Sequence, residues 1–136
     1  MIQDIQPKCY HNEYTPRPLG DGDTVFVFRG RQVLLRKEGG ALTFPTGGDM
    51  RDKNLQYLFS IDEKAFFLSR EEVPGFSFQP LFLLRKCTPQ DLCFAGMTAW
   101  HLYNWYENHR FCGKCGRSLH HHPTLRAMEC DCGNLE

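Results

Sequence analysis

Cys112-Gly113-Lys114-Cys115-Gly116 and Cys130-Asp131-Cys132-Gly133 are the two segments that decide how the last part of this 136-residue chain folds. Each segment contains two closely spaced cysteines and a glycine directly after the second one. Fourteen residues separate Cys115 from Cys130, which is close to the spacing of structural four-cysteine zinc sites. Glycine permits the tight turn that points backbone N–H groups at thiolate sulfurs. We therefore predict one structural zinc ion, bound by Cys112, Cys115, Cys130 and Cys132.

The second cysteine pair departs from the usual pattern, because C-x-C is one residue shorter than C-x-x-C. Two interpretations of the neighbouring histidine run 120–122 stay open. One of these histidines replaces Cys130 or Cys132 as a metal ligand, or the run is a solvated loop.

Three further cysteines, Cys9, Cys87 and Cys93, lie outside the two pairs. The total of seven is odd, which argues against a complete disulfide framework. Residues 1–8 lack the apolar run of a secretion signal, which favours a reducing compartment. We expect these three residues to be ordinary thiols and the protein to be cytoplasmic.

Charge, hydropathy and length limit the class of protein that this chain can be. The 16 basic and 16 acidic residues balance, so no global charge draws the chain to nucleic acid or to a membrane. No apolar run approaches the roughly 20 residues that a membrane-spanning helix needs. The length suits one domain of about 100 residues and a small metal-binding module.

The middle of the chain has strand chemistry. Residues 1–23 are rich in proline and glycine and predict an irregular lead-in. β-Branched and aromatic residues then alternate with turn residues. We expect five or six short, mostly antiparallel strands, at 24–28, 32–36, 42–44, 55–61, 65–68 and, interrupted by Pro80, within 76–84.

From Thr88 onward the apolar residues have the spacing of an α-helix. Thr88-Pro89-Gln90-Asp91 offers an N-cap, a first-turn proline and an acid, and apolar residues recur at spacings of three and four up to about Asn108. Trp100 and Trp105 on this helix form either a stacking platform for a base or, as we favour, part of a core or interface. The fold class is therefore α+β: a mostly antiparallel sheet packed by a C-terminal helix in residues 1–108, and a four-cysteine zinc ribbon in residues 109–136.

Large aromatic residues are more numerous than one small core requires. They predict a surface that is covered in the working protein, with an unusually aromatic core as the alternative. The residues concerned are Phe66, Phe67, Phe76, Phe78, Phe82, Trp100 and Trp105.

A resemblance rests on Ala99-Trp100-His101, on Arg110-Phe111 before the first cysteine pair, and on Ala127-Met128-Glu129 before the second. Together with the two pairs, these segments resemble the N-terminal half of the NADH pyrophosphatases, a branch of the Nudix hydrolases. The resemblance implies an N-terminal α+β domain, a zinc ribbon and then a catalytic Nudix domain. It also implies a homodimer that hydrolyses the pyrophosphate of NADH to NMNH and AMP, with NAD-capped RNA as a substrate of some relatives.

The catalytic box of that family is absent from residues 1–136. Nudix chemistry uses carboxylates in the pattern G-x5-E-x7-R-E-U-x-E-E-x-G-U, where U is aliphatic, to hold Mg²⁺ or Mn²⁺ on a diphosphate. Phe44-Pro45-Thr46-Gly47-Gly48 is similar to the loop before the box, but Asn54 stands where glutamate is required. Arg70-Glu71-Glu72 is in the wrong order and Pro74 would break the helix. We expect a non-catalytic fragment for assembly and substrate enclosure, whose parent supplies the catalytic domain and its metal ions.

Two other classes of function remain open. Residues 109–128 contain four lysines or arginines, four histidines and no acid, which fits a nucleic-acid-binding zinc ribbon. We prefer the interpretation that these cations offset the charge of a four-thiolate zinc site. The other class is a purely structural domain used for dimerisation.

Overall fold

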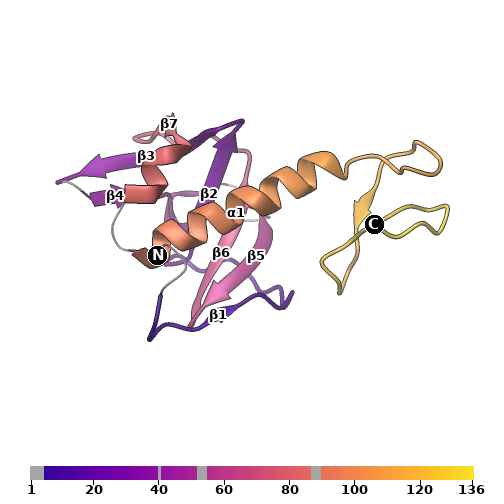
Figure 1. Ribbon diagram of the computed structural model, residues 1–136, viewed down its shortest axis with the longest axis horizontal. Coiled ribbons are helices and arrows are strands. Elements are labelled where there is room, and N and C mark those ends of the chain that lie inside the picture. Colours follow the sequence, from indigo (N-terminus) through magenta and orange to yellow (C-terminus); the bar gives the residue numbers. More distant parts are fainter. Residues whose placement is uncertain (1–4, 40, 52–54, 87–89) are drawn as a thin grey trace.

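The computed structural model describes residues 5–39, 41–51, 55–86 and 90–136. Within these ranges the chain forms an α+β fold with a mostly antiparallel sheet and one α-helix, followed by a small segment built mainly of loops. Figure 1 shows the helix α1 (Gln90–Asn108) lying across the sheet and leading directly into that segment. Among the described residues, none of the helices combines the length and the apolar character of a membrane-spanning segment.

The sheet has the strand order β1-β5-β6-β2-β3-β4, and β7 also pairs with β3. All pairs are antiparallel except the central one, where β2 and β6 run parallel. The strands are β1 (Tyr10–His11), β2 (Thr24–Arg29), β3 (Gln32–Glu38), β4 (Ala41–Thr43), β5 (Gln56–Ile61), β6 (Lys64–Ser69) and β7 (Ser77–Pro80).

Two local expectations were wrong. The lead-in is not wholly irregular, because Tyr10 and His11 pair with the end of β5. The segment 76–84 forms a strand only as far as Pro80, after which the chain enters the 3-10 helix η2 (Leu81–Lys86). Proline has no N–H to continue a sheet ladder, which accounts for the change. The expected helix start at Thr88 and Pro89 lies outside the described residues.

The cysteines outside the two pairs differ from one another. Cys9 is a free, exposed thiol. Cys93 is buried on α1 and disulfide-bonded, which corrects its interpretation as an ordinary thiol. An odd number of cysteines excludes only a complete set of bridges, and it leaves room for one. The expectation for Cys87 falls outside the described residues.

Both faces of the sheet are buried, which explains the many aromatic residues. On one face, Phe26 and Phe66 pack in a cluster that α1 covers with Ala95 and Ala99. On the other face, alternate residues of the same strands, Phe67 among them, form a second cluster. Phe76 and Phe78 pack against the second cluster, Trp100 and Trp105 pack against the first, and Phe82 is 62% exposed.

The buried carboxylate of Asp23 connects three parts of this domain. One oxygen accepts hydrogen bonds from the Arg17 guanidinium at 2.9 Å and from the backbone N–H of Ala65 at 3.0 Å. The other accepts from the backbone N–H of Gly20 at 2.8 Å. Because Ala65 belongs to β6 and Asp23 immediately precedes β2, this carboxylate fixes how the two central strands begin.

We expect Asp23→Ala to lower the free energy of unfolding by about 2–4 kcal/mol, because it leaves two backbone N–H groups without their acceptor. Asp21→Ala is the matched control: this acid is exposed on the same loop and should change stability by less than about 0.5 kcal/mol. Urea denaturation followed by circular dichroism measures both. Equal effects of the two substitutions would contradict this role for Asp23.

Candidate metal centre

Both cysteine pairs sit on tight turns that close on a glycine. In the first, the N–H of Gly116 donates to the carbonyl of Cys112 at 2.8 Å, and in the second the N–H of Gly133 donates to the carbonyl of Cys130 at 2.9 Å. Both glycines have positive φ, +79° and +95°, a region that favours glycine. The first hydrogen bond closes a turn from Cys112 to Gly116 and the second a turn from Cys130 to Gly133. The C-x-C pair therefore forms its turn with one residue fewer than the C-x-x-C pair.

The two turns bring four sulfur atoms together. The Sγ atoms of Cys112, Cys115, Cys130 and Cys132 all lie within 4.8 Å of one another. Cys115 and Cys130 are 3.3 Å apart, and Cys112 and Cys132 are 3.8 Å apart. A tetrahedron with Zn–S bonds of about 2.3 Å has S–S edges of about 3.8 Å. The arrangement therefore fits a tetrahedral metal ion, with the four predicted cysteines as the ligand set.

Hydrogen bonds stabilise the thiolate of Cys112. Its sulfur accepts from the backbone N–H groups of Cys115 at 3.4 Å and Lys114 at 3.3 Å, and from the Asn134 amide at 3.4 Å. The bond from Cys115 contributes most to lowering the pKa of Cys112 to about 6, against the opposing effect of burial. The Asn134 amide also donates to the Glu136 carboxylate, which in turn accepts from the N–H of Gly113. The residues after the second pair thus help to order the first.

The thiol of Cys130 is harder to deprotonate than that of Cys112. The backbone N–H of Cys132 favours the thiolate of Cys130, but the shared hydrogen bond with the Cys115 sulfur and burial outweigh it. Together they raise the pKa of Cys130 to about 12. A divalent cation bound between these sulfurs would take the place of the thiol proton.

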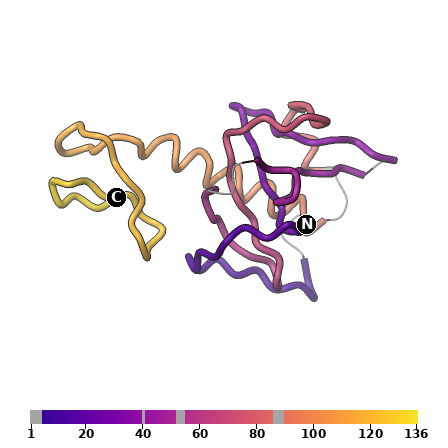
Figure 2. Tube along the Cα trace, turned by 180° about the vertical axis from the view of Figure 1, so that it is seen from behind, coloured from indigo at the N-terminus to yellow at the C-terminus, as the bar shows by residue number. Residues whose placement is uncertain are grey.

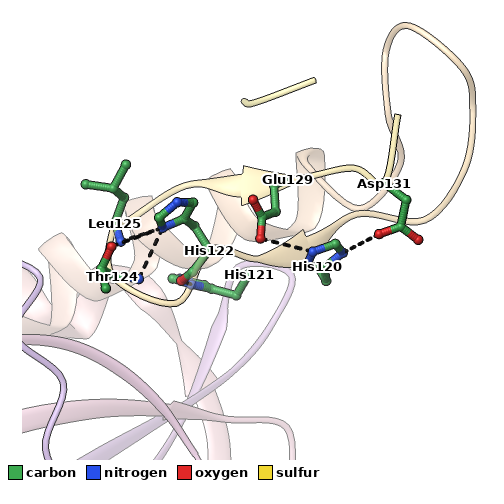
Figure 3. A network of polar contacts seen from close by, with 7 residues as sticks. All are labelled: His120, His121, His122, Thr124, Leu125, Glu129 and Asp131. Atoms are coloured by element: carbon green, nitrogen blue, oxygen red, sulfur yellow. Dashed lines mark hydrogen bonds and ion pairs between the residues drawn. The ribbon is translucent and has the colours of Figure 1, made fainter. Parts of the chain in front are cut away.

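The three histidines of the run 120–122 have other partners, as Figure 3 shows for His120 and His122. His120 faces Glu129 across the pair of β8 (His120–His121) and β9 (Met128–Glu129), with 3.1 Å between its Nε2 and the carboxylate. The Nδ1 atom of His122 accepts from the backbone N–H groups of Thr124 and Leu125. The geometry does not support a histidine ligand in place of Cys130 or Cys132.

His121 instead joins this segment to the helix and the lead-in. Its Nδ1 donates to the carbonyl of His122 at 2.7 Å, so its Nε2 accepts from the hydroxyl of Tyr106 at 2.9 Å. Burial raises the pKa of Tyr106 to about 12, which keeps this hydroxyl a donor. The His121 ring also stacks on Tyr14 with 4.8 Å between centroids.

Arg126 makes a second link between the same parts. Its guanidinium donates to the carbonyl of Asn12 at 2.8 Å and lies 5.5 Å from the ring centroid of Tyr14. Figure 2 shows the lead-in extending toward the C-terminal segment where these contacts form. Sequence reasoning missed this junction, because the partners are separated by up to 114 residues and share no motif.

The C-terminal segment has very little hydrophobic core of its own. Its buried cluster consists of Cys112, Leu119 and Cys130, with Met128 packed against it. Two of these three buried residues are members of the four-sulfur group. Such a segment depends on cross-links between its turns, because so small an apolar core cannot offset the entropy of ordering the chain.

The chain matches no protein-family model and no curated protein.

We expect the chain to bind about one metal ion through these sulfurs, and Cys112→Ser to abolish that binding. Elemental analysis of the purified protein measures the metal content. Proton–nitrogen NMR spectra should show signals of residues 109–136 collapsing to unfolded positions, whereas those of the sheet remain dispersed. Cys9→Ser is the matched control because Cys9 is free and exposed. Retention of the metal in Cys112→Ser, or its loss in Cys9→Ser, would contradict the ligand assignment.

Proposed function

We propose that the chain is the non-catalytic N-terminal domain and zinc ribbon of a Nudix-type NAD(H) diphosphatase. The observation that carries this proposal is the group of four cysteine sulfurs, with the geometry of a tetrahedral site, at the end of a helix that packs on an α+β domain. The segments around those cysteines are the ones that resemble the NADH pyrophosphatases. The parent enzyme cleaves the pyrophosphate of NADH to give NMNH and AMP, and NAD-capped RNA is a further substrate. A cytoplasmic location is part of the proposal, and the disulfide at Cys93 speaks against it because disulfides are rare in a reducing compartment.

The metal in this proposal is zinc, in a structural role. Four thiolates in a tetrahedron suit Zn²⁺, and four protein ligands leave no coordination position for water or substrate. The site therefore fixes the two turns and takes no part in hydrolysis. Its four thiolates leave a net double negative charge around Zn²⁺. The exposed cations Lys114 and Arg117 lie on or next to the first turn and partly offset it.

Hydrolysis is assigned to a Nudix domain outside residues 1–136, which would hold Mg²⁺ or Mn²⁺. The two segments that resemble parts of the Nudix box have structural partners in this chain. Thr46 and Asp49 cap the short 3-10 turn η1 (Gly47–Asp49), and Glu72 forms an ion pair with Arg29. Arg70 forms an ion pair with Glu107 of α1. These contacts support a role in folding for both segments.

Self-association is part of the same proposal. Phe82 on η2 is 62% exposed. Large exposed aromatic side chains are typical of surfaces that a partner covers. We place the contact of a homodimer on the sheet or the helix, where η2 lies, and not on the ribbon.

A nucleic-acid-binding zinc ribbon is the alternative function. Arg110, Lys114 and Arg117 are exposed and make no ion pair with any residue in the described part of the chain. Three such cations on one small segment are typical of phosphate contacts. Binding of an oligonucleotide that weakens steeply with salt would favour this function over a purely structural ribbon.

The decisive test of the proposal is the coding sequence that follows codon 136, which should encode the Nudix box. The purified chain itself should release no AMP from NADH with Mg²⁺ or Mn²⁺, because residues 1–136 lack that box. Liquid chromatography measures the nucleotide products. Turnover that Glu72→Gln abolishes would place catalytic carboxylates within the chain and contradict the proposal.

The homodimer is tested by sedimentation over a wide range of protein concentration. We expect the wild-type chain to shift toward a dimer as concentration rises, and Phe82→Ala to weaken that shift because it removes exposed apolar surface. Phe111→Ala is the matched control, since Phe111 is equally exposed but adjoins the ribbon. A strict monomer at all concentrations would leave the proposed dimer without support.

A further inference from the structure

A second candidate site lies in the α+β domain. An open cleft of about 360 Å³ is lined by the turn between β2 and β3, by η2 and by α1. Its apolar surface comes from Leu81, Phe82, Met97 and Trp100, and its charged groups are Arg31 and Arg85. Figure 1 shows η2 lying between β3 and the first half of α1. No residue of the metal-binding segment 109–136 lines the cleft, so the two sites are structurally independent.

The walls of the cleft are tied together by hydrogen bonds. The indole N–H of Trp100 donates to the carbonyl of Gly30 at 2.9 Å, which fixes the ring against the β2–β3 turn. The backbone N–H of Leu81 donates to the carbonyl of Arg31 at 2.8 Å, which fixes the start of η2 to the same turn. A ligand that enters this cleft therefore meets a surface that is already formed, and binding need not order it.

The two arginines of the cleft differ from other arginines of the domain in having no ion-pair partner among the described residues. Arg17, Arg29 and Arg36 each form an ion pair with a carboxylate. In contrast, Arg31 and Arg85 are exposed and pair with no acid among the residues that the structure describes. The guanidinium of Arg31 lies 6.0 Å from the ring centroid of Trp100, and among the described residues no acidic side chain lines the cleft. Two positive charges thus stand beside an apolar, aromatic surface.

We propose that this cleft binds a nucleoside monophosphate. The base would pack on the exposed face of Phe82 and on Trp100, since aromatic side chains stack well with bases. The phosphate carries a charge of about −1.5 to −2 at neutral pH, which matches the two guanidinium groups. A carboxylate would match only one of them. The cleft is also within the range of about 300–1,000 Å³ that is typical of small-molecule sites.

The chain offers an internal control for a binding experiment. It contains two tryptophans, both on α1. Trp100 lines the cleft, whereas Trp105 lies outside it and stacks on His109. Their two indole N–H signals can be followed separately by NMR, and Trp105→Phe assigns them. Titration of the metal-loaded chain with AMP should move the Trp100 signal and leave the Trp105 signal in place.

Adenosine and inorganic phosphate, the two components of AMP, show which part of the ligand the cleft recognises. Adenosine lacks the phosphate and inorganic phosphate lacks the base, so each should bind at least about tenfold more weakly than AMP. Equal binding of either component, or no movement of the Trp100 signal, overturns the proposal. An RNA of ten nucleotides that binds more than about tenfold tighter than AMP also overturns it, in favour of a nucleic-acid strand.

Two exposed side chains supply variants that should still fold. Arg85→Gln removes one phosphate contact and should weaken AMP binding about tenfold, and Phe82→Ala should weaken it by a similar factor through lost stacking. Arg51→Gln is the matched control, because Arg51 is exposed and does not line the cleft. Because Phe82 is also placed at the proposed dimer contact, calorimetric titration measures each affinity at a protein concentration at which sedimentation shows a monomer. Unchanged affinity in Arg85→Gln and Phe82→Ala, or an equal loss in Arg51→Gln, overturns the proposal whatever the outcome at the metal centre.

Discussion

The carboxylate of Asp23 is the contact on which the arrangement of the sheet depends. The central pair β2 and β6 is parallel, so the chain must pass through β3, β4 and β5 before the two strands meet. Parallel neighbours need a long crossover and gain nothing from a short turn. Their start is instead fixed by Asp23, which accepts from Ala65 of β6 while it holds Gly20 and Arg17 of the lead-in. One buried acid thus links the register of β2 with β6 to the path of the N-terminal segment.

The C-terminal segment is organised on a different physical basis. The sheet domain has two apolar clusters, one on each face, whereas the segment buries little beyond Cys112, Leu119 and Cys130. Its two turns are joined through sulfur atoms and through the Asn134 and Glu136 side chains. The stacked and hydrogen-bonded His121 then fixes it to Tyr106 and Tyr14. A metal ion at the four sulfurs would stabilise both the turns and, through them, this junction.

Features with a local physical cause were predictable from the sequence. The hairpin of β2 and β3 follows from β-branched and aromatic segments that alternate with turn residues. The end of α1 at Asn108 follows from the helical spacing of apolar residues, and the four-cysteine group from the cysteine spacing. Other features depend on partners that are distant in sequence. β1 has two residues, too few for a periodic signal, and exists because the end of β5 is available to pair with it. The link between Arg126 and Asn12 likewise could not be read from local patterns. The unbroken apolar runs 25–28 and 65–68, in contrast, are a local sign that both faces of the sheet are buried.

A metal ion held by all four sulfurs would limit where recognition can occur in this chain. A tetrahedral ion held by four thiolates has no free position, so it can shape the segment but cannot bind a substrate. The exposed groups able to recognise a ligand are therefore aromatic rings and unpaired guanidiniums. Such groups meet at the cleft, where Arg31 and Arg85 flank Trp100 and Phe82 on the domain with two apolar clusters. They also meet beside the ribbon, where the Arg110 guanidinium lies 5.9 Å from the ring centroid of Phe111. In the α+β domain, hydrogen bonds fix the β2–β3 turn to η2 and to α1 without any metal, which suits the binding role that we propose for the cleft. Our two proposals would thus separate structural support from ligand recognition between the two parts of the molecule.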